Sequence, residues 1–182
     1  MDASVKERVL KKFVEILSQN GIENTTTRQL YGAAGVGSTM VYEEWGSKEN
    51  MVIAAGKYIT DVISQDVGSE LHEYARNYTV LGEYFFNVFK RHREEMRFCI
   101  QLMSSPNEKY SVVHKHIGQA FEEWSNELAD ILDIDRKLFF GSYLLFMSSI
   151  YFYCMTGNEA ESRWQRFHLY EEFNHLKETE KG

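Results

Sequence analysis

Two small groups of titratable side chains are the candidates for catalytic or metal chemistry in this sequence. Glu172 and His175 have the Glu-x-x-His spacing that places a carboxylate and an imidazole on one face of a helix, as in di-iron bundles. Such a centre needs a second pair and further glutamates, and no second pair occurs. His114 and His116 are two residues apart, so a helix would point them to different sides. The sequence predicts no metal site, no cofactor and no enzyme.

Motifs for nucleotide or acyl-transfer chemistry are missing as well. The sequence has no phosphate-cradling glycine loop and no G-x-S-x-G. Cys99 and Cys154 lie far apart, which fits two buried thiols in a reducing compartment better than a disulfide. Charged residues interrupt the first ten positions, so no signal peptide is expected. We therefore expect a cytoplasmic protein.

The most informative stretch runs from Thr25 to Met51, where two short helices joined by a tight turn precede the start of a third. Thr26 and Gln29 have the spacing of a capping box, which predicts a helix running to Ala34. Gly35 follows, and a glycine just past a helix end can adopt the left-handed conformation that a Cβ penalises. The pattern is that of a helix-turn-helix.

The second short helix is predicted from Ser38 to Trp45. Its apolar Val41 and Trp45 share one face because they are four residues apart. The side chains left more exposed are Ser38, Thr39, Tyr42 and Glu43. Ser47 is predicted to cap a longer connector helix over about residues 47–65.

This stretch resembles the N-terminal DNA-binding signature of the TetR/AcrR family of bacterial transcriptional regulators. The resemblance needs no gap and covers the first quarter to third of the chain. It is carried by Thr26-Thr27-Arg28, Ala34-Gly35-Val36, Val41-Tyr42, Trp45 and Ser47-Lys48-Glu49. It implies an all-helical homodimer that binds a palindromic double-stranded DNA operator and releases it when a small molecule enters the C-terminal domain.

The resemblance also implies which side chains contact DNA. The positions concerned are Thr27, Arg28, Ser38, Thr39, Met40, Tyr42, Glu43 and Lys48. The first two would meet phosphate or a nearby base, and the next three would face the major groove. Tyr42 and Lys48 would each hold a phosphate. Glu43 could accept a hydrogen bond from a cytosine amino group.

Four positions depart from the family's pattern. Glu43 and Glu44 stand where neutral, aromatic or histidine side chains are more usual, and two carboxylates there would repel phosphate. Tyr31 replaces a small residue, and Gly37 replaces the usual polar cap. These departures leave three readings open: weak binding, an unusual operator, or a TetR-like helical ligand sensor or protein-partner module that has lost DNA binding.

The charge balance also bears on DNA binding. Lys and Arg number 20 against 27 Asp and Glu, for a net charge of −7, which by itself argues against a nucleic-acid protein. The excess of acidic residues lies mostly beyond residue 50. The N-terminal region is therefore less acidic than the rest without being basic.

The remainder of the chain is predicted to form helices only, because no stretch of useful length alternates apolar and polar residues with the period of two that a β-strand shows. The expected fold is all-α with about nine helices: a three-helix DNA-binding domain at residues 1–46 and a helical bundle for ligand binding and dimerisation at 47–182. Helices are expected over 3–20, 69–91, 96–104, 108–132, 135–156 and 159–177. The uncharged residues 138–155 touch the lower limit for a membrane span, but a domain core plus a dimer interface produces the same pattern.

The aromatic residues of the C-terminal domain suggest two surfaces. A ligand pocket for a small apolar or aromatic molecule is expected to use Tyr78, Phe85, Phe89, Phe98, Met103, Tyr110, Phe121, Trp124 and Tyr143. Any one of these could instead simply fill the core. The expected dimer interface comprises Phe146, Ile150, Tyr151, Trp164, Phe167 and Tyr170. A ligand-responsive repressor is the favoured function, and a helical-bundle enzyme is a further alternative.

Overall fold

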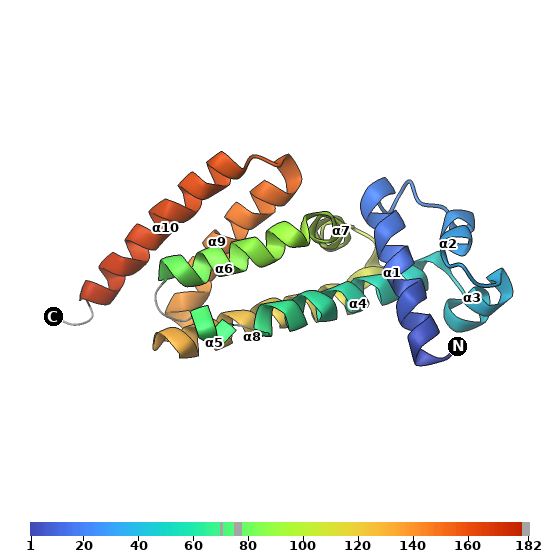
Figure 1. Ribbon diagram of the computed structural model, residues 1–182, viewed down its shortest axis with the longest axis horizontal. Coiled ribbons are helices and arrows are strands. Elements are labelled where there is room, and N and C mark those ends of the chain that lie inside the picture. Colours follow the sequence, from blue (N-terminus) through green and yellow to red (C-terminus); the bar gives the residue numbers. More distant parts are fainter. Residues whose placement is uncertain (70, 75–77, 180–182) are drawn as a thin grey trace. The chain divides into compact units, whose positions relative to one another are not determined.

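The computed structural model describes residues 1–69, 71–74 and 78–179, and all regular structure in those residues is helical (Figure 1). Ten α-helices and one 3₁₀ helix occur in this part of the chain. Their bounds are α1 (Ala3–Asn20), α2 (Thr27–Ala33), α3 (Ser38–Trp45), α4 (Lys48–Gly68), α5 (Leu71–Tyr74), α6 (Tyr78–Arg91), α7 (Arg93–Met103), η1 (Glu108–Tyr110), α8 (Ser111–Leu132), α9 (Arg136–Thr156) and α10 (Glu159–Thr179). The expected all-α fold class is confirmed.

The helices group into two compact units that do not follow chain order. The first unit combines Met1–Val62 with Glu94–Gln119. The second combines Ile63–Arg93 with Ala120–Gly182. Helices α4 and α8 therefore each contribute to both units.

Helices α1 to α3 form a small head within the first unit, and local capping chemistry explains their ends. The Thr26 hydroxyl accepts from the Gln29 backbone N–H at 3.3 Å, and the Gln29 side chain accepts from the Thr26 N–H at 2.7 Å, which completes the predicted capping box. Gly35 has φ +66°, so the turn adopts the left-handed conformation that glycine tolerates. The Phe13 and Trp45 rings meet edge to face at 5.1 Å and join α1 to α3.

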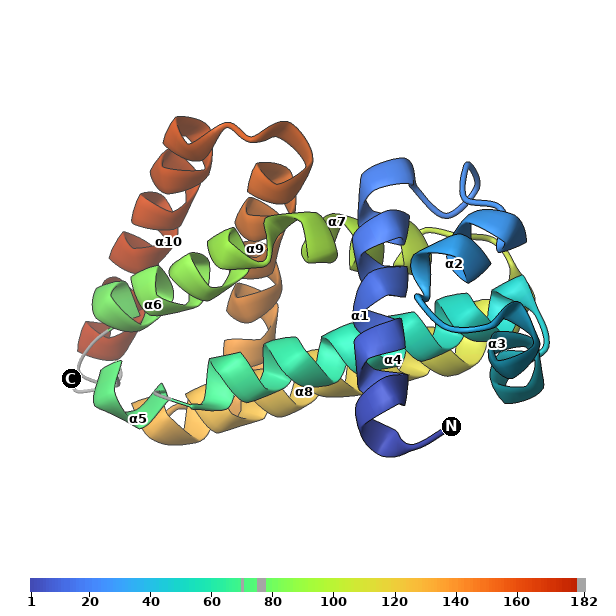
Figure 2. The same cartoon turned by 45° about the vertical axis from the view of Figure 1, so that its right-hand side comes forward.

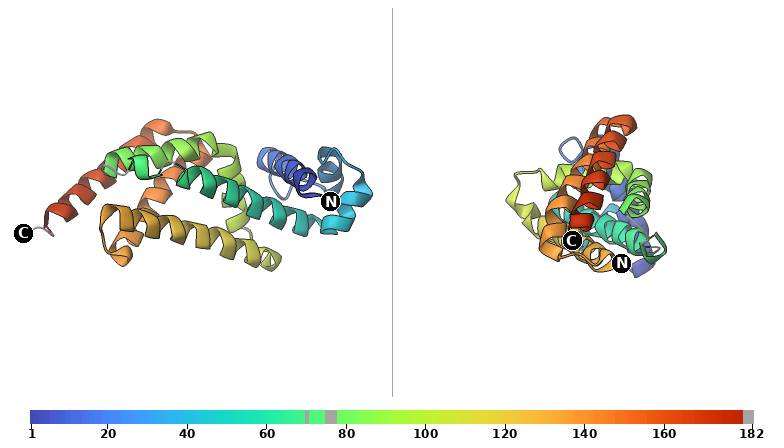
Figure 3. Two further views of the ribbon diagram at one scale, coloured as in Figure 1. Left: turned by 60° about the horizontal axis from the view of Figure 1, so that its bottom comes forward. Right: turned by 90° about the vertical axis from the view of Figure 1, so that its left-hand side faces the viewer.

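The rest of the first unit packs the beginning of α4 against α7 and the beginning of α8, and these parts of α4 and α8 lie side by side (Figure 3, left). Gly56 makes this possible, because a Cβ there would lie 2.6 Å from Leu102 and 2.9 Å from Val113. On the same contact, His116 Nε2 lies 2.8 Å from Asp61 Oδ1.

The second unit is built around a hairpin of α9 and α10, on which α6 packs (Figure 2). Gly157 forms the hairpin turn with φ +73°. A buried arginine joins α10 to α6: Arg166 Nε donates to Glu83 at 3.2 Å, and its guanidinium lies 3.4 Å from the centre of the Phe86 ring. Ser162 donates to the Ser149 carbonyl at 2.9 Å and joins α10 to α9.

Three helices differ from the sequence expectation, and the one expected over 108–132 begins with the 3₁₀ helix η1 before α8. The stretch 69–91, predicted as one helix, forms the single turn α5 and the longer α6, with residues 70 and 75–77 outside the described part. Helix α7 begins at Arg93 rather than at Met96, because Glu94 and Glu95 occupy its first turn, where acidic side chains favour a helix.

Helix α9 carries the apolar stretch noted in the sequence. Within the described residues, Phe139–Thr156 is the one segment long and apolar enough to cross a membrane by length and composition, a test that the core helix of a soluble protein also passes. One side of α9 is packed in the unit, and the other exposes Phe140, Leu144, Leu145, Tyr151 and Met155.

Candidate nucleic-acid interface and ligand cavity

The outer face of α3 presents the side chains that the sequence assigned to DNA. Ser38, Thr39 and Glu43 are exposed, and Met40 and Tyr42 are 45 % and 60 % exposed. The buried side of the helix holds Val41 and Trp45, as the spacing predicted. The helix therefore offers one polar face and fixes the other in the head.

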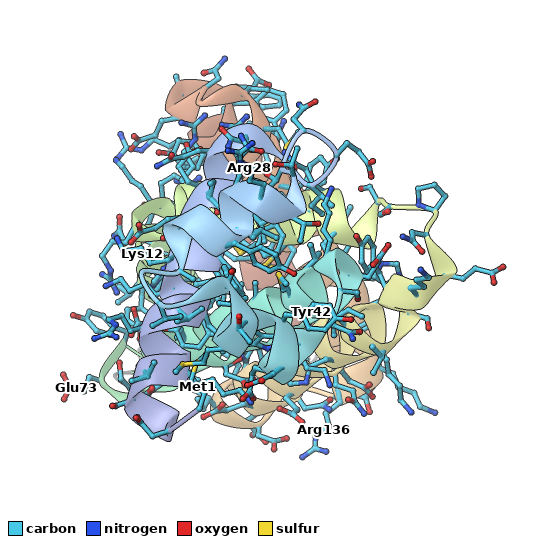
Figure 4. All side chains as sticks on the ribbon, turned by 90° about the vertical axis from the view of Figure 1, so that its right-hand side faces the viewer. Met1, Lys12, Arg28, Tyr42, Glu73 and Arg136 are labelled. Atoms are coloured by element: carbon cyan, nitrogen blue, oxygen red, sulfur yellow. The ribbon has the colours of Figure 1, made fainter. Side chains whose placement is uncertain are left out.

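Three further candidates come from the helices on either side of α3. Arg28 on α2 is exposed, and Arg28 and Tyr42 lie on the face of the head turned toward the viewer in Figure 4. Thr27 and Lys48, at the first positions of α2 and α4, are half-buried. The start of α3 has no side-chain cap, because Gly37 occupies the capping position. Its first N–H groups carry partial positive charge and suit a phosphate.

The two carboxylates of α3 are in different environments. Glu44 is directed to α1, where its Oε1 lies 2.6 Å from Lys6 Nζ and its Oε2 lies 3.4 Å from the N-terminal ammonium of Met1. The hydrogen bond from Lys6 holds the pKa of Glu44 below its ordinary value of 4.5. Glu43 is exposed. Glu43 therefore faces outward and has no ion-pair partner in the described part of the chain, whereas the charge of Glu44 is paired within the head.

The residues predicted to line a ligand pocket are divided between the two units. Phe85, Phe89, Phe121, Trp124 and Tyr143 belong to the second unit. Phe98, Met103 and Tyr110 belong to the first, where Met103 is exposed and the other two are buried in its core. The side chain of Tyr78 lies outside the described residues.

An apolar cavity of about 40 Å³, partly open at the surface, lies in the second unit. Its walls come from α6, α8, α9 and α10: Leu81, Gly82, Phe85, Leu128, Leu132, Phe139, Tyr143, Phe146 and Tyr170. Of the predicted pocket residues, Phe85 and Tyr143 line it. Phe89 and Phe121 instead pack on Trp124, with ring centres 5.7 and 5.2 Å from it. The spacing of apolar residues could have suggested the leucines, but nothing in the sequence marks Gly82 as part of a cavity wall.

Two tyrosines line this cavity, and their hydroxyls are buried. Tyr143 is 1 % exposed, and burial raises the pKa of its phenol far above the ordinary value. Burial also raises the pKa of Tyr170, and the negative charge of Glu83 adds to the rise. The Tyr143 hydroxyl has no hydrogen-bond partner in the described structure. Both hydroxyls are neutral; that of Tyr143 is available to a ligand, whereas that of Tyr170 lies close to Arg166 and Glu83.

The predicted dimer residues fall into a buried and an exposed set. Phe146, Ile150 and Tyr170 are buried within their own unit. Tyr151, Trp164 and Phe167 are exposed, the last two by 59 % and 56 %. Trp164 and Phe167 on α10 add to the exposed apolar side chains of α9 already described, and exposed apolar side chains in such number are typical of an association site.

The histidines of the first unit have structural partners. His114 Nε2 lies 2.7 Å from the Leu102 carbonyl oxygen, while His116 contacts Asp61. Among the described residues, no three His, Cys, Asp or Glu side chains gather as a metal site would require. The side chains of the Glu172 and His175 pair lie outside the described residues.

Comparison with known proteins gives a family for the head. Residues 9–55 match the family described as bacterial regulatory proteins, tetR family. This range contains α2 and α3 and confirms the resemblance seen in the sequence. No curated protein matches the sequence of the chain.

Solved structures share the fold over nearly the whole chain. A putative transcriptional regulator from Pseudomonas aeruginosa PAO1 is 12 % identical, with a TM-score of 0.72 over 94 % of this chain and 89 % of that one. A putative TetR-family transcriptional regulator from Rhodococcus sp. is 15 % identical, with a TM-score of 0.69 over 95 % and 98 %. The transcriptional regulator FadR from Bacillus subtilis, solved in complex with stearoyl-CoA, is 17 % identical, with a TM-score of 0.61 over 90 % and 96 %.

Proposed function

The chain has the N-terminal domain and the fold of tetR-family transcriptional regulators, and on that premise we propose that it is a cytoplasmic repressor that binds a palindromic operator as a homodimer and is released by a small ligand. In this proposal residues 1–46 bind DNA, and residues 47–182 bind the ligand and dimerise. The chain acts by binding and catalyses no reaction.

The observation that carries the proposal is the outer face of α3. A recognition helix must bring short polar groups to base edges while its other side stays fixed in the domain. Helix α3 meets both requirements, with Ser38 and Thr39 outward and Trp45 packed on Phe13. Arg28, Tyr42 and Lys48 would supply phosphate contacts around it.

The exposed apolar side chains of α9 and α10 support a homodimer. Two recognition helices must lie about one duplex turn, ~34 Å, apart to enter successive major grooves. Trp164 and Phe167 would pair the two copies that hold the helices at this separation. A ligand that favours another arrangement of the pair would shift the population away from the DNA-bound state.

The cavity in the second unit supports a small-molecule effector. The Bacillus subtilis regulator with this fold was solved with stearoyl-CoA, so a chain of this shape can hold a molecule with a long apolar part. Apolar walls with a few polar groups are the usual composition of a ligand site.

Binding to DNA from upstream of the chain's own coding sequence tests the proposal. Fluorescence anisotropy with that duplex and with a random duplex of equal length should show a preference for the former. The affinity should fall steeply with salt, by about 0.9 logarithmic units per tenfold salt for each phosphate contacted. An absence of binding to any duplex at low salt would favour a TetR-like ligand sensor or protein-partner module instead.

A further inference from the structure

The cavity of the second unit is lined by a tyrosine hydroxyl that lacks an acceptor among the described residues. Tyr143 on α9 and Tyr170 on α10 both line it; the Tyr143 hydroxyl has no partner in the described structure, whereas the Tyr170 hydroxyl lies close to Arg166 and Glu83. Leaving a buried polar group unpaired costs free energy that folding must offset, so such groups are uncommon in native proteins. The unpaired Tyr143 hydroxyl beside a small cavity indicates a site adapted to something that binds there.

The lining of the cavity also restricts the charge of its occupant. No charged side chain is among the lining residues that the structure describes, and an ionised group placed there would lose its hydration without a counterion among them. The nearby buried cation, Arg166, already has partners within the protein. Arg166 donates through Nη1 to Ser162 Oγ at 2.7 Å and through Nε to Glu83, and it stacks on Phe86.

We propose that this cavity binds a small uncharged molecule with an apolar body and a carbonyl oxygen that accepts a hydrogen bond from Tyr143, and that Tyr170 closes the cavity. A ketone, an ester and a tertiary amide share this chemistry. The inference rests on the proposed function, because it names the class of effector which that function requires.

The closing role of Tyr170 follows from the size of the cavity and from Gly82. A cavity of about 40 Å³ is much smaller than the roughly 150 Å³ that accommodates benzene, so a wall must move when a ligand enters. A Cβ at residue 82 would overlap the Tyr170 hydroxyl and ring, so this ring occupies the space left by a missing side chain. That contact is the place where the wall can yield, because the Tyr170 ring is held there by packing against a residue without a side chain.

Movement of Tyr170 would displace the outer face of α10. Phe167 precedes it by one helical turn and is exposed, as is Trp164. A ligand that displaces the Tyr170 ring would therefore act on the helix that presents the proposed dimer contacts. This links occupancy of the cavity to the arrangement of the pair.

Three six-membered-ring probes test the ligand class: cyclohexanone, its isosteric hydrocarbon methylenecyclohexane, and the charged cyclohexanecarboxylate. Thermal unfolding of the full chain should shift upward most with cyclohexanone, less with the hydrocarbon, and not with the carboxylate. In Tyr143→Phe the advantage of the ketone over the hydrocarbon should fall about three- to tenfold in affinity, the worth of one hydrogen bond. Tyr153→Phe is the matched control, since Tyr153 is buried on the same helix, does not line the cavity and packs on Phe86.

The free protein gives an independent readout. Without ligand, Tyr143→Phe should raise the midpoint of unfolding by about 2–4 °C, because it removes an unpaired buried hydroxyl. A lower midpoint would show that the hydroxyl is already paired in the free protein and would overturn the inference. So would equal stabilisation by the carboxylate, or an unchanged ketone preference in Tyr143→Phe.

DNA binding separates this inference from the proposed function. Wild type and Tyr143→Phe are both titrated with the upstream duplex. If both bind it and the ketone preference is absent, only the assigned ligand class fails. If neither binds any duplex while the ketone preference is present, the cavity assignment stands and the DNA-binding function fails.

Discussion

Lys6 and Glu44 form an ion pair between α1 and α3, with Lys6 Nζ 2.6 Å from Glu44 Oε1. The pair removes one of the two carboxylates of α3 from the outer face and satisfies its charge within the head. It also fixes the orientation of α3 on α1, beside the contact of Phe13 with Trp45. The two adjacent glutamates therefore have separate effects that mutation can distinguish.

Replacing Glu43 by Gln should strengthen binding to DNA. The substitution removes an exposed negative charge from the face proposed to meet DNA, and we expect affinity for random duplex to rise roughly two- to fivefold. Any preference for cytosine at the base that it reads should weaken at the same time. Anisotropy titrations measure both. Glu44→Gln is the matched control, and it should lower stability without strengthening binding.

The Lys6–Glu44 pair should make the head sensitive to acid. Because the hydrogen bond from Lys6 lowers the pKa of Glu44 below 4.5, the unfolded chain binds this proton more tightly than the folded chain does. The pair's contribution is therefore present above pH 4.5 and is lost as pH falls through the lower folded-state pKa. Denaturant unfolding at neutral and acid pH should show a difference between wild type and Glu44→Gln that shrinks on acidification. A difference independent of pH would contradict this linkage.

Removing the proposed phosphate-binding side chains should weaken binding to all duplexes alike. In Tyr42→Ala combined with Lys48→Ala, affinity for the specific and the random duplex should fall in parallel while the dimer persists. The slope of affinity against salt should become shallower by about 0.9 logarithmic units for each phosphate that the variant no longer binds. Lys115→Ala, which removes an exposed cation outside the head, should have little effect. Unchanged affinity in the double variant would contradict the phosphate roles.

Charges placed on the outer face of α10 should separate the two copies. Trp164→Glu combined with Phe167→Glu puts two carboxylates on exposed apolar positions, and sedimentation should then show a monomer. Affinity for the operator should fall by at least tenfold, because one head alone contacts one half-site. Val112→Glu introduces a charge at an exposed apolar position of the first unit and should leave the assembly intact. A dimer that survives the double substitution would place the interface elsewhere.

The sequence predicted the head well because its signals are local. Thr26 and Gln29 are three residues apart, and their hydrogen bonds depend only on that turn of helix. Gly35 was placed correctly in the left-handed region for the same reason. The ion pair of Glu44 with Lys6 was not predictable, since the two residues are far apart in the sequence.

The cavity was harder to predict because it depends on which helices meet. Phe85 and Phe89 are four residues apart on one face of α6, yet the first lines the cavity and the second packs on Trp124. Tyr170 was expected at the dimer interface but lies inside its own unit, while Phe167, three residues earlier, is exposed. Apolar spacing shows that a side chain is buried and does not show against what it is buried.

The contact of Gly82 with Tyr170 leads to the last prediction. A methyl group at residue 82 would overlap the Tyr170 ring, so Gly82→Ala should destabilise the protein by about 1–3 kcal/mol, as overpacking of a core does. Gly118→Ala is the matched control: it also lies in a helix, nothing lies within 4 Å of its Cβ position, and it should stabilise by roughly 0.5–1 kcal/mol. Replacing Tyr170 by Leu together with Gly82→Ala should restore part of the stability, giving a favourable coupling in a double-mutant cycle. Equal effects of the two alanine substitutions in denaturant unfolding would show that the ring is not held against Gly82, and the closing role of Tyr170 would then have no basis.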